Sequence, residues 1–122
     1  MAQNLGMTER VFEDRMFVGD HPPVFLPGTL SGGSHVSGTV CGIVTATGKR
    51  VQLDPAADPA DGSEQAACIL LGDVDASEGD EPAVFMEHGV AIDHYLTWPD
   101  GITENEKAAA VAELKAAGIF VK

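Results

Sequence analysis

Glycine and proline constrain the fold of this 122-residue chain most strongly, since it contains 14 glycines and 7 prolines. Three prolines fall within the short stretch "PPVFLP" (22–27). Proline lacks a backbone donor and restricts the residue before it, so this stretch cannot be helical. Elsewhere glycines separate short runs of β-branched residues, a pattern typical of strands joined by turns. The sequence therefore predicts a mainly β fold and excludes an all-helical bundle.

Strand candidates follow one another along the middle of the chain. A β-branched run over 39–45, a turn at Thr47 and Gly48, and a second run over 49–53 predict a hairpin. A polar loop over 54–65 precedes the apolar strand "AACILLGDVDA". "EPAVFMEHGVAIDHYLTW" predicts one or two further strands, with Gly89 marking a bend or bulge.

One helix is predicted near the C-terminus. Thr103 and Glu106 form a capping box, and alanine-rich sequence carries the helix to about Ala117. Gly118 supplies a left-handed cap, after which "GIFV" can return as a last strand. We thus expect a mainly β fold with one C-terminal α-helix.

The length fits a single domain preceded by an arm. Residues 1–20 mix charges with isolated apolar residues, too few and too irregularly spaced to build a core. We therefore expect an extended N-terminal arm over 1–20, mobile when free, and a β-rich domain over 21–122.

Charge and hydropathy limit the partners. The formal charge of −12 repels phosphate backbones, so direct nucleic-acid binding is not expected. No apolar run approaches the roughly 18 residues that cross a bilayer, and the N-terminus lacks the apolar core of a signal peptide. We expect a soluble protein made in the cytoplasm. There, Cys41 and Cys68, each within an apolar run, fit buried free thiols better than a disulfide.

The acidic stretch "GDVDASEGDE" (72–81) invites comparison with a calcium loop. With Asp73 as the first ligand, Glu78 occupies the position that requires glycine, and Val84 the position of the bidentate glutamate. The calcium template fails, which favours a solvated connection between strands.

Other chemical motifs are equally weak. "GIVTATGKR" misplaces the second glycine of a phosphate loop, and no serine lies in a nucleophile elbow. His88 and His94 share a strand face only if Gly89 leaves the register unchanged. Trp98, followed by Pro99, is expected to anchor a core or an interface. We expect no enzyme, no metal and no cofactor.

Several short motifs follow one another in a set order and spacing over residues 25 to 122. They are the hairpin at 38–44, the "DGS" loop at 61–63 with Ala67, Ile69 and Leu70, "VDAS" at 74–77, "HG" at 88–89, and Leu96, Trp98, Pro99, Gly118, Ile119 and Val121. Together they resemble the head decoration proteins of tailed bacteriophages, the family of the lambda decoration protein D. Ser37 replaces a usually charged family residue.

This resemblance implies a β-clip-like domain that binds the outside of the mature icosahedral head as a homotrimer and reinforces it against packaged DNA. The major capsid protein would be the partner. The resemblance also implies that the arm contacts the shell, and we expect Arg10, Phe12, Arg15 and Phe17 to contribute. Leu96, Trp98 and Pro99 are the expected trimer or core anchor.

Two alternatives stay open at this point. The first is a small β-rich enzyme or metal-dependent binding module that uses the acidic loop, with Asp73, Asp75, Asp80, His88 and His94. The second is an adaptor that docks its arm on a protein other than a capsid. Metal-binding and capsid-binding assays distinguish the three functions.

Overall fold

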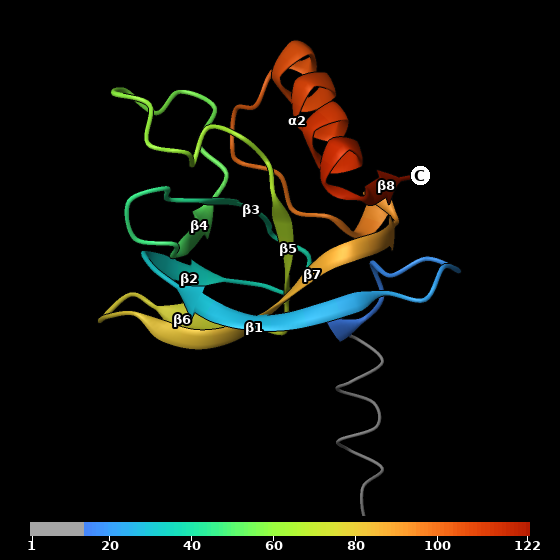
Figure 1. Ribbon diagram of the computed structural model, residues 1–122, viewed down its shortest axis with the longest axis horizontal. Helices are drawn as coiled ribbons and strands as arrows, with labels where there is room; N and C mark the ends of the chain where they lie inside the picture. The colour runs from blue at the N-terminus through green and yellow to red at the C-terminus, as the bar shows by residue number, and fades with distance from the viewer. Residues whose placement is uncertain (1–13) are drawn as a thin grey trace, which may run out of the picture.

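The computed structural model describes residues 14–122 (Figure 1). The elements are β1 (Val24–Leu30), β2 (Gly33–His35), β3 (Val40–Ile43), β4 (Arg50–Gln52), β5 (Cys68–Leu71), β6 (Val74–Ala76), β7 (Glu81–Ala91), the short 3-10 helix η2 (Asp93–Tyr95), α2 (Glu104–Ala117) and β8 (Ile119–Val121). The predicted mainly β fold with one C-terminal helix is confirmed.

Six strands form one sheet in the order β1-β4-β3-β5-β7-β8. Because β1 also pairs with β7, the sheet closes on itself as a small barrel. This closure covers the free edge of β1, which would otherwise offer unpaired backbone groups to other chains. Strands β2 and β6 form a separate two-stranded sheet. The predicted hairpin is present as the antiparallel pair of β3 and β4.

β7 is the central strand, since it pairs with β1, β5 and β8. It runs through Gly89 as one strand rather than two. Gly89 has φ +139°, and an added Cβ would lie 3.2 Å from Pro23 Cα. The register between β1 and β7 shifts between Val24 and Phe25, close to this glycine. The predicted irregularity is therefore a local bulge within a continuous strand.

The core has two parts because adjacent residues of a strand point to opposite sides. Val40, Ile69 and Met86 belong to one cluster, while their chain neighbours Cys41, Leu70 and Phe85 belong to the other. α2 covers the first cluster through Ala110 and Leu114. The other members of the first cluster are Phe17, Leu53, Ala66, Ala91, Leu96 and Ile119, and those of the second are Leu30, Cys68, Ala76 and Ala83.

The ends of α2 are as predicted. The Thr103 side chain accepts from the Glu106 backbone N–H, and the Glu106 side chain accepts from the Thr103 backbone N–H. Gly118 adopts a left-handed conformation with φ +102° and donates to the carbonyl of Leu114. This cap turns the chain directly into β8, which pairs in parallel with β7.

The segment before β1 departs from the prediction. Phe17 is only 1% exposed and belongs to the first core cluster, so the expectation that this segment cannot contribute to a core is wrong there. Its backbone carbonyl accepts from Ile92 N–H at 2.6 Å, and Val18 forms an antiparallel bridge with Ala91. Residues 14–20 therefore pack on the domain as a turn followed by a bridge. Residues 1–13 of the predicted arm lie outside the described residues.

Candidate functional site

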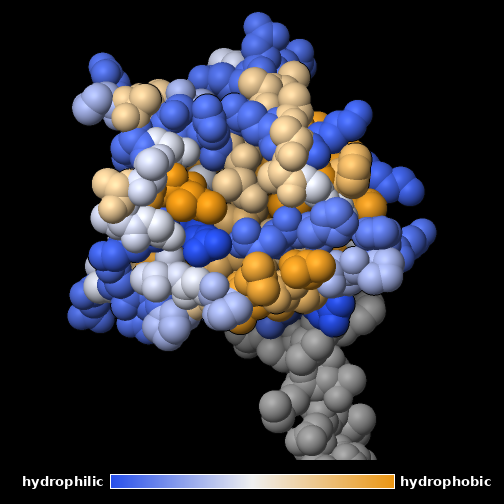
Figure 2. Space-filling view, viewed as in Figure 1, coloured by the Kyte–Doolittle hydropathy of each residue, from blue (hydrophilic) through white to orange (hydrophobic). Residues whose placement is uncertain are grey.

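Exposed apolar side chains lie on the paired strands β1 and β7. Val24 and Leu26 are 45% and 47% exposed, and Val84 is 38% exposed. Apolar atoms gather over β1 in the lower half of Figure 2. Large apolar side chains that gather on a surface, unlike singly scattered ones, indicate a contact surface for another macromolecule.

The first described residues lie against this part of the barrel. The guanidinium carbon of Arg15 lies 5.1 Å from the centre of the Phe25 ring, a cation–π contact with β1. Met16 is 38% exposed. The Ser37 hydroxyl donates to the carbonyl of Asp14 at 2.6 Å and fixes the point where the chain joins the domain. The N-terminal segment thus enters the domain beside an exposed part of β1.

The four expected capsid contacts divide into three groups. Arg10 and Phe12 lie outside the described residues. Arg15 lies at the surface on Phe25, where its charge is available to a partner. Phe17 is a core residue in this conformation, so its ring is not available to fill a hollow on a partner. The sequence could not reveal this, because the cluster that buries Phe17 is formed by β3, β5, β7 and α2, far along the chain.

Two residues of the predicted trimer or core anchor, Leu96 and Trp98, pack in or on the core of a single chain. Leu96 is 9% exposed and belongs to the first core cluster, and the half-buried Trp98 packs against it. Pro99 is half-buried at the start of the turn into α2. Backbone bonds position the segment: Thr97 N–H donates to Gly38, and Thr97 carbonyl accepts from Val40.

A polar cluster fixes the Trp98 ring. Its Nε1–H donates to Asp93 Oδ1 at 2.9 Å, and Lys107 Nζ donates to Asp93 Oδ2 at 2.9 Å. Lys107 Nζ also lies 5.3 Å from the centre of the indole ring. Burial opposes ionisation of Asp93, but the bonds from Lys107 and Trp98 outweigh it and lower the pKa of this carboxyl. The cluster joins η2 to α2, and no local sequence pattern indicates it.

The acidic stretch contains a strand as well as turns. Residues 74–76 form β6, which pairs with β2. The Asp75 carboxylate accepts from the Ser77 hydroxyl and the Ser77 backbone N–H, and both bonds lower its pKa. Asp80 forms an ion pair with Lys49. Asp73 Oδ1 accepts from Ser37 N–H at 2.9 Å. These carboxylates face three separate donors rather than one common centre.

The histidines do not form a pair at 88 and 94. The His88 ring lies 5.5 Å from the ring of His21, and the His94 ring lies 5.0 Å from that of Tyr95. Among residues 14–122, no three histidine, cysteine or acidic side chains are grouped so that they could hold a metal ion. The five residues of the metal or enzyme alternative are thus distributed over separate contacts.

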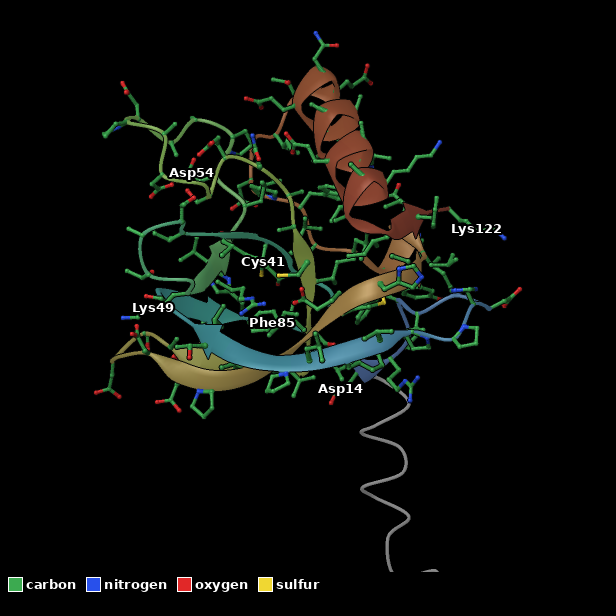
Figure 3. All side chains as sticks on the ribbon, in the orientation of Figure 1. Asp14, Cys41, Lys49, Asp54, Phe85 and Lys122 are labelled. Atoms are coloured by element: carbon green, nitrogen blue, oxygen red, sulfur yellow. The ribbon has the colours of Figure 1, made fainter. Side chains whose placement is uncertain are left out.

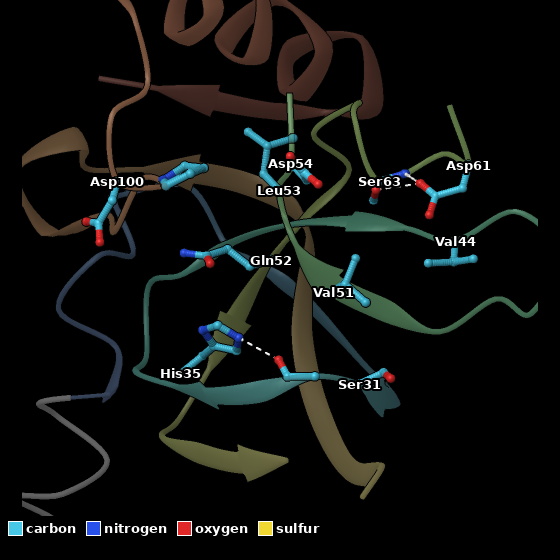
Figure 4. Close-up of a pocket in the computed structure, with 12 residues that line it drawn as sticks. Ser31, His35, Val44, Val51, Gln52, Leu53, Asp54, Asp61, Ser63 and Asp100 are labelled. Atoms are coloured by element: carbon cyan, nitrogen blue, oxygen red, sulfur yellow. Dashed lines mark hydrogen bonds between the residues drawn. The ribbon is translucent and has the colours of Figure 1, made fainter. Parts of the chain in front are cut away.

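A hollow of about 580 Å³ lies between β2, β4 and the loops that follow β4 and Trp98 (Figure 4). His35 Nε2 lies 2.8 Å from the Gly32 carbonyl oxygen, and Asp61 accepts from the Ser63 backbone and hydroxyl. The bonds from Ser63 lower the pKa of Asp61. Sequence reasoning missed this hollow because separate loops create it. Its lining is Ser31, Gly32, His35, Val44, Val51, Gln52, Leu53, Asp54, Asp61, Ser63, Pro99 and Asp100.

Comparison with known families identifies the class of protein. The family model for the bacteriophage lambda head decoration protein D matches residues 27–119, which is more than half of the chain. The chain therefore belongs to this family of structural proteins of the phage head. Comparison with curated proteins finds no sequence match. Within residues 14–122, no helix is both long and apolar enough to cross a membrane.

Proposed function

We propose that this head decoration protein binds the outer surface of the mature icosahedral shell as a homotrimer and reinforces it against the pressure of packaged DNA. Its partner is the major capsid protein, and it is made in the host cytoplasm before it joins the head. Family membership supports a role on the capsid. The observation that carries attachment is the exposure of Val24 and Leu26 on β1, the strand whose Phe25 ring is in contact with Arg15 of the N-terminal segment.

Attachment uses the N-terminal segment. Arg10 and Arg15 pair with carboxylates of the shell, and Phe12 enters an apolar hollow, because isolated apolar residues among charges suit an added strand or a docked segment. Phe17 acts indirectly, since its buried ring ties the segment to the barrel. Arg10, Phe12 and Arg15 thus contact the shell, whereas Phe17 holds the segment that carries them on the barrel.

Deletion of residues 2–13 tests this mode of attachment. The deletion ends before Asp14, so it keeps the Ser37 bond and the buried Phe17 ring. We expect the truncated protein to unfold at the same urea concentration as the full chain but to lose co-sedimentation with empty, expanded shells. Arg15→Ala in the full chain should weaken binding without a matching loss of stability. Near-normal binding of the truncated protein would refute the role of the segment.

The trimer buries apolar surface that one chain leaves exposed. Leu96 is largely covered already, so exposed sheet residues outside the attachment surface of β1, such as Val84 on β7 and Phe120 on β8, have more apolar area to contribute. A core of this size is a weak source of stability alone, and oligomerisation adds to it. Light scattering at micromolar concentration should give a trimer mass. Monomers both in solution and on the shell would refute the trimer.

Reinforcement is tested on DNA-filled heads that lack decoration protein. We expect saturating protein to raise the temperature at which these heads release DNA, because a ligand that binds only the intact shell stabilises it by mass action. The matched control is the 2–13 deletion, which keeps the domain but lacks the proposed attachment. Binding without any change in DNA release would leave attachment intact and refute reinforcement.

A further inference from the structure

The two cysteines lie directly opposite each other in the barrel. Cys41 on β3 pairs with Cys68 on β5 in antiparallel register. Directly opposed residues of antiparallel strands have Cα atoms about 4.5–5.5 Å apart. Disulfides span Cα separations of about 4.4–6.8 Å, so this pair meets the first requirement for a bond.

The side chains also face the same side. Both cysteines belong to the second core cluster, and both are fully buried with free thiols. The Cys41 thiol donates to the Thr39 carbonyl at 3.5 Å, and the neighbouring Cys68 thiol together with burial raises the pKa of Cys41 well above its usual value. In Figure 3, Cys41 lies inside the barrel, next to β5. The two sulfur atoms are therefore already neighbours in the reduced protein.

We propose that Cys41 and Cys68 form a latent disulfide site that closes under oxidising conditions and locks β3 to β5. This inference does not rest on the proposed capsid attachment. The co-reactant is a small-molecule disulfide. One cysteine thiolate attacks it and releases one small thiol, and the second cysteine then attacks the mixed disulfide and releases another. The protein loses two protons and two electrons, and the small disulfide gains both.

Burial governs the rate of this reaction. A thiolate is the attacking species, and the raised pKa of Cys41 keeps its thiol protonated. Exchange therefore requires local opening that admits the small disulfide. The same burial protects the bond once it has formed. Free thiols suit the reducing host cytoplasm, whereas a decoration protein on a released virion meets oxidising surroundings.

The bond would stabilise the barrel. It closes the loop between positions 41 and 68, which includes β4 and the long polar loop. A bond that closes a loop of this length lowers the conformational entropy of the unfolded chain. We therefore expect the melting temperature to rise by about 10 °C. Because directly opposed strands already hold the residues together, the folded barrel needs little rearrangement.

The test is to refold the full chain from urea with oxidised and reduced glutathione, which gives the thiols access to the oxidant. We expect a monomer mass lower by two hydrogens, no thiol titratable in denaturant, and a melting temperature about 10 °C higher than that of the reduced protein. Dithiothreitol added in denaturant should remove the difference. The Cys68→Ala variant, treated in the same way, should show no such rise.

Three results would overturn the proposal. They are two free thiols after refolding, glutathione adducts in place of an internal bond, and an internal bond that lowers the melting temperature. The comparison of oxidised with reduced wild-type protein needs no substitution, so it holds even if Cys68→Ala fails to fold.

Discussion

Replacing Phe17 with alanine should severely destabilise the domain, although the residue lies before the first strand. The ring is 1% exposed and packs in the cluster formed by β3, β5, β7 and α2. Truncation of a buried phenylalanine costs about 3–5 kcal/mol, from lost burial and the cavity that remains. Domains of this kind have a total stability of about 5–15 kcal/mol, so the loss is a large part of it.

Urea unfolding followed by the fluorescence of Trp98, the only tryptophan, measures this effect. The bond from Ile92 N–H to the Phe17 carbonyl involves only backbone atoms, so the variant reports on the ring. We expect a lower midpoint with an unchanged slope. The matched control is Met16→Ala, whose side chain is 38% exposed and whose loss should cost less than about 1 kcal/mol. A Phe17→Ala variant within about 0.5 kcal/mol of wild type would refute the core assignment.

Three further predictions concern the polar cluster, the helix cap and the acidic stretch. The folded state lowers the pKa of Asp93, so its contribution to stability is complete above about pH 4 and is lost as the pH falls through the folded-state pKa. Asp93→Asn should lower the free energy of unfolding by about 1 kcal/mol at neutral pH. It should also weaken the dependence of that free energy on pH in the acid range, as measured by urea unfolding at several pH values. Gly118→Ala should lower stability by about 1–2 kcal/mol in urea unfolding, because φ is +102° and the added Cβ would lie 2.5 Å from His88 Nδ1. Millimolar calcium should leave the melting temperature unchanged, since Asp75 is bonded to Ser77; a chelator-reversible rise of several degrees would contradict this.

Local sequence signals predicted the elements whose contacts are local. The α2 capping box needs only Thr103 and Glu106, and the left-handed cap needs only Gly118. The hairpin of β3 and β4 follows from a short turn between two β-branched runs. These predictions were correct because residues that are near each other in the sequence determine these features.

Contacts between distant segments were not predictable from patterns. β6 pairs with β2, and Val18 bridges to Ala91, across long stretches of chain. Phe17 resembled an isolated apolar residue because the surface that buries it is formed by later elements. The motif order identified the family, but only the structure reveals that Trp98 donates to Asp93 and that Lys107 donates to the same carboxylate.

Saturation binding to empty, expanded heads tests the central claim most directly. Heads without decoration protein are mixed with increasing amounts of the full chain and pelleted, and the bound copies are counted per head. We expect binding to saturate at one trimer, or three copies, per threefold site of the shell. The bound copies should lie on the outer surface, as judged by access to an added protease. Absence of binding, or binding that does not saturate, would contradict the assignment as a head decoration protein.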